Sequence, residues 1–317
     1  MQIIHGTTDF QLNTDTAIAM GKFDGVHMGH RKLLESILNK RESGLKTCIF
    51  TFDPAPAVLF GLSDGRELST REEKRILFEK MGIDILVEFP MTMETAAIPG
   101  DNFVREYLCG KLGARYIAAG EDVSFGSRGA GNTALLQQLQ PELGYELDII
   151  EKVCMDGEEV SSTRIRALVE AGRMREAAKL LGAPYTVKGV VSNGRKIGRT
   201  IGFPTLNIHP DEDKLMPCKG VYFSRVCIRE KDAGAKQEIY TAISNVGWKP
   251  TVSEERIMGV ETYVYDFERD IYGADVEVAL LEFHRPEVSF ESLEALKNQL
   301  KDDIEAGKNW HFKAKKM

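Results

Sequence analysis

The sequence has few cysteines and no cysteine pair at a spacing that marks a metal or redox site. Its five cysteines stand far apart along 317 residues, and because their number is odd we predict neither a disulfide framework nor a zinc site. Scattered thiols are typical of a reducing compartment. We therefore expect a cytoplasmic protein whose cysteines stay reduced.

Long apolar runs and an excess of positive charge are also missing. No stretch reaches the roughly 18 apolar residues that cross a bilayer, and the first residues have neither the basic nor the apolar region of a secretory leader. The net charge is −7, from 41 basic and 48 acidic side chains, whereas binding nucleic acid without sequence preference needs a basic surface. We expect no membrane segment and no nucleic-acid partner, and the sequence carries no signal for an oligomeric state.

Strand and helix patterns alternate over the first 182 residues. The strand-like stretches are 16–20, 46–52, 83–89, 115–119 and 145–152. The stretches with a helical period are 28–41, 70–81, 101–111, 133–139, 161–171 and 174–181. This alternation predicts an α/β fold in which helices cover both faces of a parallel sheet, and such sheets bind ligands beyond the carboxyl ends of their strands.

The pattern changes after Pro184. Strand-like stretches then follow one another without helices between them, at 185–192, 220–229, 239–244, 259–267 and 275–283. One helical pattern, 289–308, comes after them. Consecutive strands predict an antiparallel β-barrel or sandwich, here closed by a C-terminal helix. We therefore predict two domains, residues 1–182 and residues 185–317.

The ten residues from Gly21 to His30 read GKFDGVHMGH and are the most informative stretch of the sequence. They join a predicted strand to a predicted helix, and a helix start directs free backbone N–H groups at an anion such as phosphate. His27 and His30 are three residues apart, so their imidazoles lie on one face of the first turn. Since no third ligand stands at a local spacing, a triphosphate fits better than a metal. The alternative is a turn with two surface histidines.

Two further segments carry groups that suit a nucleotide. Ser162, Thr163 and Arg164 stand at a predicted helix start, where hydroxyls and a guanidinium can contact phosphate oxygens. Taken alone, this string is better explained as a helix cap. The loop GEDVSFG, which contains Asp122 and Phe125, follows a predicted strand, so Asp122 could contact an adenine, a ribose or a flavin. In isolation it would be an ordinary polar loop.

The second half lacks the GxxxxGK[ST] string of P-loop kinases. In its place is a basic, glycine-rich loop able to fold over phosphates, which contains Gly194, Lys196, Gly198, Gly202 and Pro204. Thr205 and Asn207 follow in an extended segment and point to the same side of it. Their hydroxyl and amide oxygens are ligands suited to an ATP-bound Mg²⁺. A hairpin with polar faces is the alternative.

Glu261 is the candidate base for an alcohol acceptor. On a strand it shares a face with Tyr263, Tyr265 and Phe267. A carboxylate among aromatic rings is partly desolvated, which makes it a better base. An edge-strand glutamate that faces solvent is the alternative. The residues alone therefore indicate nucleotide chemistry at two sites.

Together and in this order, the motifs resemble those of the bacterial bifunctional riboflavin kinase/FAD synthetase family. GKFDGVHMGH resembles the family's GxFDGxHxGH, VSSTRIR its ISSTRIR, and GEDVSFG the segment that lines the nucleotide and flavin pocket. GFPTLN resembles the kinase motif GxPTAN, and VET the strand with the catalytic glutamate. SNVGWKPT and FHRP, which contain Asn245 and Arg285, resemble SNVGTRPT and FLRP. The sequence departs from the common family form at Lys22, Ala55, Leu206 and Trp248.

The resemblance implies a Rossmann-like nucleotidyltransferase domain followed by a riboflavin kinase barrel. The barrel would phosphorylate riboflavin to FMN with ATP, with Glu261 as the catalytic base and Thr205 and Asn207 on Mg²⁺ and the nucleotide. The first domain would adenylylate FMN to FAD with ATP and release pyrophosphate. The residues implied at its triphosphate are His27, His30, Arg164, Ser162, Thr163, Gly21, Phe23, Asp24 and Gly29. Those implied in the flavin or nucleotide pockets are Asp122, Phe125, Asn245 and Arg285.

Two other functions remain open. The first is a cytidylyl- or adenylyltransferase that acts on another phosphorylated metabolite, which the kinase motifs of the second half disfavour. The second is a flavin-binding regulator with decayed active sites. Such a regulator would have lost reactive residue types at positions 27, 30, 205, 207 or 261, and all five keep them.

Overall fold

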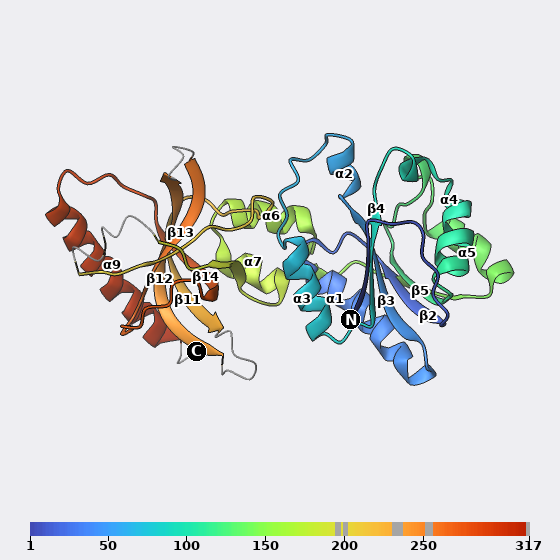
Figure 1. Ribbon diagram of the computed structural model, residues 1–317, viewed down its shortest axis with the longest axis horizontal. Coiled ribbons are helices and arrows are strands. Elements are labelled where there is room, and N and C mark those ends of the chain that lie inside the picture. Colours follow the sequence, from blue (N-terminus) through green and yellow to red (C-terminus); the bar gives the residue numbers. More distant parts are fainter. Residues whose placement is uncertain (194–197, 199–201, 230–236, 251–255, 315–317) are drawn as a thin grey trace. The chain divides into compact units, whose positions relative to one another are not determined.

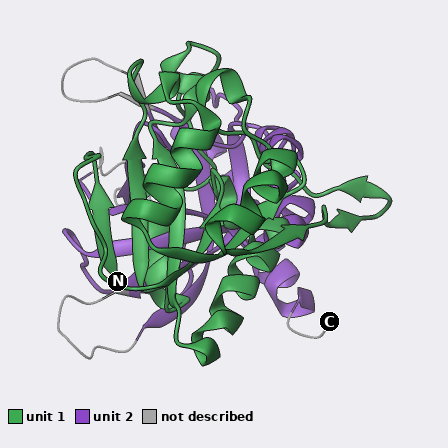
Figure 2. Ribbon diagram, turned by 90° about the vertical axis from the view of Figure 1, so that its right-hand side faces the viewer, with its two compact units in different colours: residues 1–162 green, residues 163–317 purple. Residues whose placement is uncertain are grey.

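The structure is a computed structural model that describes residues 1–193, 198, 202–229, 237–250 and 256–314 (Figure 1). It divides into two compact units, residues 1–162 and residues 163–317 (Figure 2). Most of the helices α6 (Ser162–Glu170) and α7 (Met174–Leu181) therefore belongs to the second unit. The reason is that α7 packs on the second sheet, where Arg175 pairs with Glu282. The domain limits 1–182 and 185–317 stay a prediction about where the two activities separate.

A six-stranded parallel sheet forms the first unit, in the order β1-β4-β3-β2-β5-β6. Its strands are β1 (Gln2–His5), β2 (Thr16–Met20), β3 (Lys46–Asp53), β4 (Ile85–Pro90), β5 (Ala114–Gly120) and β6 (Glu146–Ile150). The strand β2 pairs with β3 on one side and with β5 on the other, so the direction of chain progression reverses there. Open α/β sheets bind ligands at the carboxyl ends of the strands beside such a reversal.

Helices cover both faces of this sheet, as predicted (Figure 1). The helices of this unit are α1 (Met28–Asn39), α2 (Pro56–Leu59), α3 (Arg71–Lys80), α4 (Gly100–Asn102), the π-helical η4 (Phe103–Lys111) and α5 (Thr133–Leu143). On one face, Leu34 and Ile37 of α1 and Phe78 of α3 form a buried cluster with the sheet. On the other face, Leu108 and Leu136 belong to a second cluster. On both sides of the sheet, the apolar faces of the helices thus pack on the strands, as the α/β fold requires.

The second unit is a six-stranded antiparallel sheet in the order β10-β13-β12-β11-β14-β9. Its strands are β9 (Tyr185–Val190), β10 (Leu206–Ile208), β11 (Gly220–Arg229), β12 (Glu238–Pro250), β13 (Arg256–Val264) and β14 (Asp275–Arg285). The sheet curls until its two edges meet, where the N–H of Ser192 donates to the carbonyl of Asn207 over 2.8 Å. The helix α9 (Leu293–Ala314) packs on the sheet through Trp310, whose ring lies 5.5 Å from that of Phe223. The predicted antiparallel barrel with a C-terminal helix is confirmed.

Several short elements escaped the sequence patterns. The strand β1 contributes one buried side chain, Ile4, and is too short to show a period. A small hairpin pairs β7 (Cys154–Met155) with β8 (Glu158–Glu159), and it turns through Asp156 and Gly157 at positive φ. All five cysteines are free thiols, as expected. In the described part of the chain, no helix combines the length and apolarity needed to cross a bilayer.

Candidate active sites

The GKFDGVHMGH loop leaves the carboxyl end of β2 and enters α1 through the short turn η1 (Asp24–Val26). Phe23 and Val26 have φ angles of 51° and 42°, in a region of backbone conformation that residues other than glycine rarely adopt. Both side chains are completely buried. Packing in the core therefore imposes the strained turn, and such strain is typical of functional loops.

The two histidines of this loop lie against each other. Their rings are stacked with centroids 3.8 Å apart. His27 caps α1, and its Nδ1 accepts a hydrogen bond from the backbone N–H of His30 over 3.4 Å. A Cβ at Gly29 would lie 3.2 Å from the His27 ring, so glycine leaves the ring room to pack. The spacing of the motif thus places both imidazoles on one side, as predicted.

Burial keeps both histidines neutral. Desolvation lowers the pKa of His27 to about 4, although the charges of Asp24 and Glu159 oppose the shift. Desolvation, the neighbouring His27 and the charge of Lys74 lower the pKa of His30 well below its ordinary value. Because His27 accepts at Nδ1, its proton lies on Nε2. The buried Nδ1 of His30 has no hydrogen-bond partner among the described residues. Such an orphaned polar atom indicates a place for a ligand.

Acid is expected to destabilise the first unit through this pair. Below about pH 6.5 the unfolded chain protonates its histidines, whereas folded His27 stays neutral down to about pH 4. The unfolded state then binds more protons, so the free energy of unfolding falls across this window, by up to about 3 kcal/mol for His27. Urea unfolding across this range should show a smaller loss for His27→Gln/His30→Gln than for the unsubstituted chain. An equal loss would contradict the burial of neutral imidazoles.

The SSTR segment meets the loop at Ser162. Its hydroxyl donates to the carbonyl of Asp24 over 2.9 Å, and the Asp24 carboxylate accepts from the N–H of Leu68 over 2.7 Å. Asp24 therefore ties the loop to two distant segments. Thr163 and Arg164 follow directly in the first turn of α6, where Thr163 is exposed and Arg164 is partly buried.

Three other predicted residues of the first unit have different surroundings. Gly21 lies at the end of β2, where a Cβ would come 3.2 Å from the Phe23 ring. Asp122 is exposed after β5, with a carboxylate oxygen 3.3 Å from Lys152 Nζ. Phe125 is buried, and its ring lies 5.5 Å from that of Phe103 in the core. Phe125 is therefore a core residue, and its predicted contact with a ligand stays a prediction.

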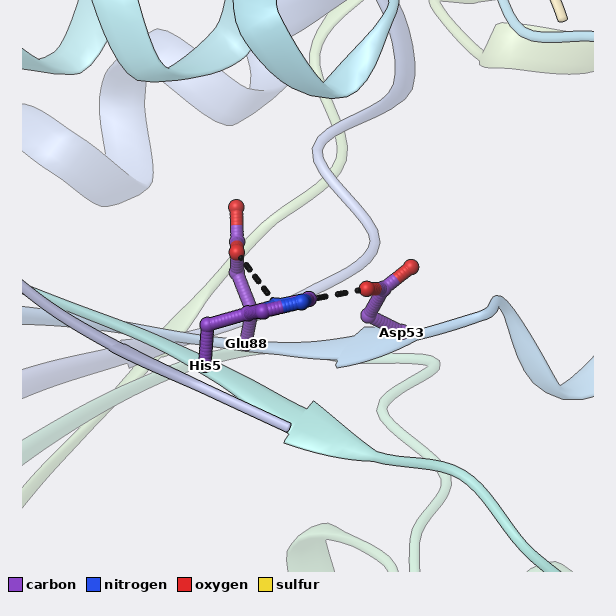
Figure 3. A group of neighbouring side chains, drawn as sticks. All are labelled: His5, Asp53 and Glu88. Atoms are coloured by element: carbon purple, nitrogen blue, oxygen red, sulfur yellow. Dashed lines mark ion pairs between the residues drawn. The ribbon is translucent and has the colours of Figure 1, made fainter. Parts of the chain in front are cut away.

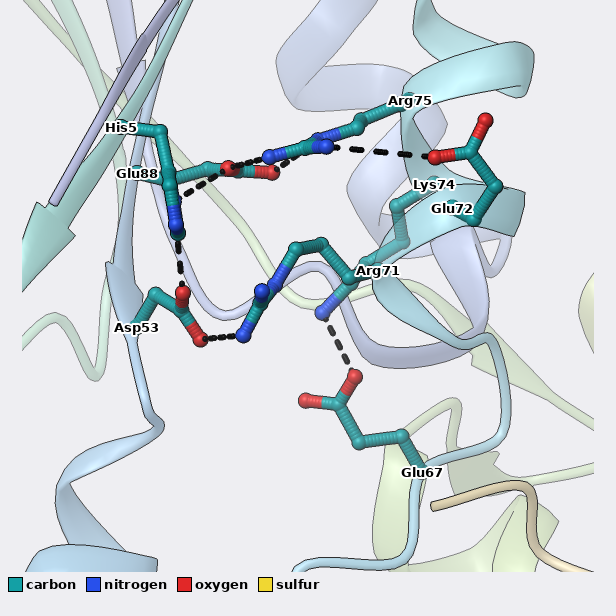
Figure 4. A network of polar contacts seen from close by, with 8 residues as sticks. All are labelled: His5, Asp53, Glu67, Arg71, Glu72, Lys74, Arg75 and Glu88. Carbon is teal, nitrogen blue, oxygen red and sulfur yellow. Dashed lines mark hydrogen bonds and ion pairs between the residues drawn. The ribbon is translucent and has the colours of Figure 1, made fainter. Parts of the chain in front are cut away.

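A polar cluster whose members were not predicted as site residues lies at the carboxyl ends of β1, β3 and β4. His5 Nδ1 is 2.9 Å from Glu88 Oε2 and 3.4 Å from Asp53 Oδ2 (Figure 3). An imidazole and two carboxylates are donors suited to a metal. However, Arg71 and Arg75 of α3 also bind these carboxylates (Figure 4). Because the arginines already balance both charges, we assign the cluster to the attachment of α3 to the sheet.

In the second unit, the predicted residues form one row across the sheet. Asn207 on β10 lies opposite Glu261 on β13, which lies opposite Asn245 on β12. The row continues through Val221 on β11 to Arg285 on β14. Residues in direct register share a face of the sheet, so four polar side chains from four strands point to the same side.

This row lines a pocket of about 530 Å³. Thr205, Gly198 and Tyr263 line it too, together with apolar residues of α9 such as Leu300 and Ile304. One wall is apolar and the other carries hydroxyl, amide, carboxylate and guanidinium groups. The pocket therefore suits a ligand with a flat apolar part and a polar chain.

Ion pairing on α9 orients one end of the row. Arg285 donates two hydrogen bonds to Asp303, of 2.9 and 2.6 Å, and Asp303 is completely buried. Gln299 donates to the same carboxylate over 2.9 Å. At Asn245, the side-chain N–H donates to Glu287 over 2.9 Å, while its buried Oδ1 has no hydrogen-bond partner in the part of the chain described. Sequence spacing could not reveal the pairs Arg285–Asp303 and Asn245–Glu287, because each joins different elements. Gln299 and Asp303, in contrast, are one turn apart on α9.

One expectation about the surroundings of Glu261 is wrong in part, and two predicted loop residues lie outside the part of the chain that the structure describes. Phe267 does not accompany Glu261, because β13 ends at Val264 and the Phe267 ring packs on that of Tyr240 at 5.0 Å instead. Tyr265 stays on the expected side, since its ring lies 6.1 Å from that of Tyr263 and belongs to the same cluster. Gly194 and Lys196 lie outside the described residues. The backbone N–H of Phe203 donates to the carbonyl of Gly198 over 2.7 Å, where a Cβ would overlap the Phe203 backbone. Gly202 and Pro204 are exposed.

Known proteins resemble this chain over nearly its whole length. The FAD synthetase family matches residues 9–164, and the riboflavin kinase family matches residues 181–311. A bifunctional riboflavin kinase/FMN adenylyltransferase from Listeria monocytogenes is 35% identical over 302 residues, which cover 94% of this chain and 93% of that protein. Its namesake from Bacillus subtilis is 31% identical over 313 residues, 96% of each chain. A crystal structure described as a macrolide-efflux protein from Streptococcus pneumoniae has a TM-score of 0.85 and 30% identity, and covers 97% of this chain and 98% of its own.

Proposed function

Because the chain belongs to the bifunctional riboflavin kinase/FMN adenylyltransferase family, we propose that its two reactions take place at the two groups of side chains described above. The chain phosphorylates riboflavin to FMN with ATP, and it adenylylates FMN to FAD with ATP. The observation that carries the assignment of the kinase site is the polar row from Asn207 through Glu261 to Asn245, which lines a single pocket.

In the kinase reaction, Glu261 acts as the base. The 5′-hydroxyl oxygen of riboflavin forms a bond to the γ-phosphorus of ATP, the bond to the leaving ADP breaks, and the hydroxyl proton passes to Glu261. Asn245 and Arg285 contact the flavin. The glycine-rich loop covers the phosphates with Gly194, Lys196, Gly198, Gly202 and Pro204. Placing acceptor and phosphate in one pocket lowers the barrier mainly by alignment.

Thr205 and Asn207 would hold an ATP-bound Mg²⁺. Their hydroxyl and amide oxygens are hard ligands, and both residues line the pocket beside the carboxylate of Glu261. This donor set fits Mg²⁺, which binds few protein oxygens and keeps several waters. When bound, the ion neutralises charge on the phosphates. Leu206 lies between the two ligands and points to the opposite side of the strand.

Replacing Asn207 with leucine tests this assignment. We expect Asn207→Leu to raise the Mg²⁺ concentration for half-maximal FMN formation by about 10-fold or more, because losing even a residue that only orients a metal ligand typically costs about 10- to 100-fold in metal affinity. The Mg²⁺ requirement for FAD formation from supplied FMN should stay unchanged, which provides a control within the same chain. Chromatography of the flavins over a Mg²⁺ titration measures both. An unchanged requirement for FMN formation would exclude Asn207 as a ligand.

In the adenylyl transfer, a phosphate oxygen of FMN bonds to the α-phosphorus of ATP and pyrophosphate leaves. No protein nucleophile is needed, so the chain contributes alignment and hydrogen bonds to the developing charge. His27 and His30 donate to the triphosphate as neutral imidazoles. The backbone around the loop residues Gly21, Phe23, Asp24 and Gly29 shapes their surroundings. From the SSTR segment, Ser162, Thr163 and Arg164 complete the phosphate contacts, while Asp122 and Phe125 border the adenine or flavin.

The remaining assignments concern the chain as a whole. We place the boundary between the activities at residues 183–185, close to residue 181, where the match to riboflavin kinase begins. The partners are the small molecules ATP, riboflavin, FMN and FAD, with no role for nucleic acid. Five free cysteines agree with a cytoplasmic location.

A further inference from the structure

The segment before α3 and the helix itself are fastened to the GKFDGVHMGH loop, residues 21–30, which we call the HxGH loop after its two histidines. The N–H of Leu68 donates to the Asp24 carboxylate over 2.7 Å, and the Phe23 ring lies between His30 and Phe78 of α3, with centroid distances of 5.2 and 5.8 Å. One face of α3 is therefore held close to the histidine pair.

Lys74 lies on that face, four residues before Phe78, which is one helical turn. Its side chain is only 12% exposed, and Nζ is 2.8 Å from the Glu67 carboxylate (Figure 4). Its charge contributes to lowering the pKa of the buried His30, in keeping with its place on this face of α3. The neighbouring Arg71 and Arg75 are turned toward the sheet, where they bind Asp53 and Glu88 (Figure 4).

The proposed triphosphate site needs positive charge, which Lys74 can supply. A triphosphate carries several negative charges, yet burial keeps both histidines neutral. Neutral imidazoles donate hydrogen bonds but compensate little of that charge. A partly buried ammonium beside them is the kind of group that does, since a charged donor binds phosphate about twice as strongly as a neutral one.

We propose that Lys74 is a phosphate-binding residue of the adenylyl transfer site and that Glu67 holds it when no nucleotide is bound. When ATP binds, a phosphate oxygen of the triphosphate replaces the Glu67 carboxylate as the hydrogen-bond acceptor of the Lys74 ammonium group. Glu67 is then hydrated, since its side chain is already 22% exposed to solvent. No bond other than hydrogen bonds changes. The inference rests on the proposed role of the HxGH loop.

Substitution of the lysine tests the proposal in the full chain. We expect Lys74→Met to raise KM for ATP in FAD formation from FMN by about 10-fold or more, the effect of losing one charged hydrogen bond. KM for ATP in FMN formation should not change, because that reaction uses the other unit. The matched control is Lys80→Met, an exposed lysine in the last turn of the same helix, which should alter neither.

The opposite sign is expected when the partner is replaced. Glu67→Gln removes the competing carboxylate, so KM for ATP in FAD formation should fall by about 2-fold or more. A pair with a merely structural role predicts impairment from both substitutions, and this outcome would overturn the proposal, as would a normal KM in Lys74→Met. If His27→Ala/His30→Ala retained FAD formation, the role of the HxGH loop itself would be wrong. If that variant were inactive while Lys74→Met behaved normally, only the present inference would fail.

Discussion

Glu261→Gln is expected to stop FMN production while FAD formation from supplied FMN continues at its normal rate. The amide cannot accept the proton of the riboflavin hydroxyl, and general base catalysis typically contributes a factor of about 10² to 10⁴. The substitution preserves size, and Glu261 lies in a row with Asn207 and Asn245, so the pocket should keep its shape. Chromatography of flavins after incubation with ATP, Mg²⁺ and either riboflavin or FMN measures both reactions.

The matched control for this substitution is Glu305→Gln, an exposed glutamate of α9 that lies outside the pocket lining. It should leave both reactions unchanged. Substantial FMN production by Glu261→Gln would remove Glu261 from its role as the base. Loss of both reactions in a variant with an unaltered urea unfolding midpoint would show that the two activities do not occupy separate sites.

The double substitution His27→Ala/His30→Ala is expected to give the reverse pattern. FAD formation should fall by at least about 10³-fold, because removal of a single donor to transition-state charge costs about 10² to 10³. The stacked imidazoles also pack against Phe23 and Gly29, so the unfolding midpoint of the variant is measured alongside. FMN should accumulate from riboflavin at the normal rate. His209→Ala, at an exposed histidine, serves as the control and should preserve both products.

The fold followed from the sequence wherever an element was long enough to show its period. Leu34 and Ile37 on α1, and the alternation of strands with helices, predicted the parallel sheet and the helices on both its faces. The strands β1 and β10 are too short for a periodic signal, and only pairing with neighbours defines them. Of the aromatic residues expected beside Glu261, Phe267 lies elsewhere because β13 ends at Val264, a boundary that no local pattern announces.

The site residues, too, could be predicted where they are close in sequence and not where tertiary packing brings them together. His27 and His30 are only three residues apart, so their spacing alone indicates that the two rings lie together. The pairs Arg285–Asp303 and Lys74–Glu67 and the cluster around His5 depend on tertiary packing. A single sequence contains no signal for such partners, because the spacing between them follows from the lengths of intervening loops and elements.

Mixing the two inactive variants tests the separation of the sites most directly. Given riboflavin, ATP and Mg²⁺, neither Glu261→Gln nor His27→Ala/His30→Ala alone should make FAD. An equimolar mixture should make it, since FMN released by the histidine variant is the substrate of the intact adenylyltransferase site in the other. Failure of the mixture to produce FAD, while FMN accumulates and both variants remain folded, would contradict the existence of two independent sites in this chain.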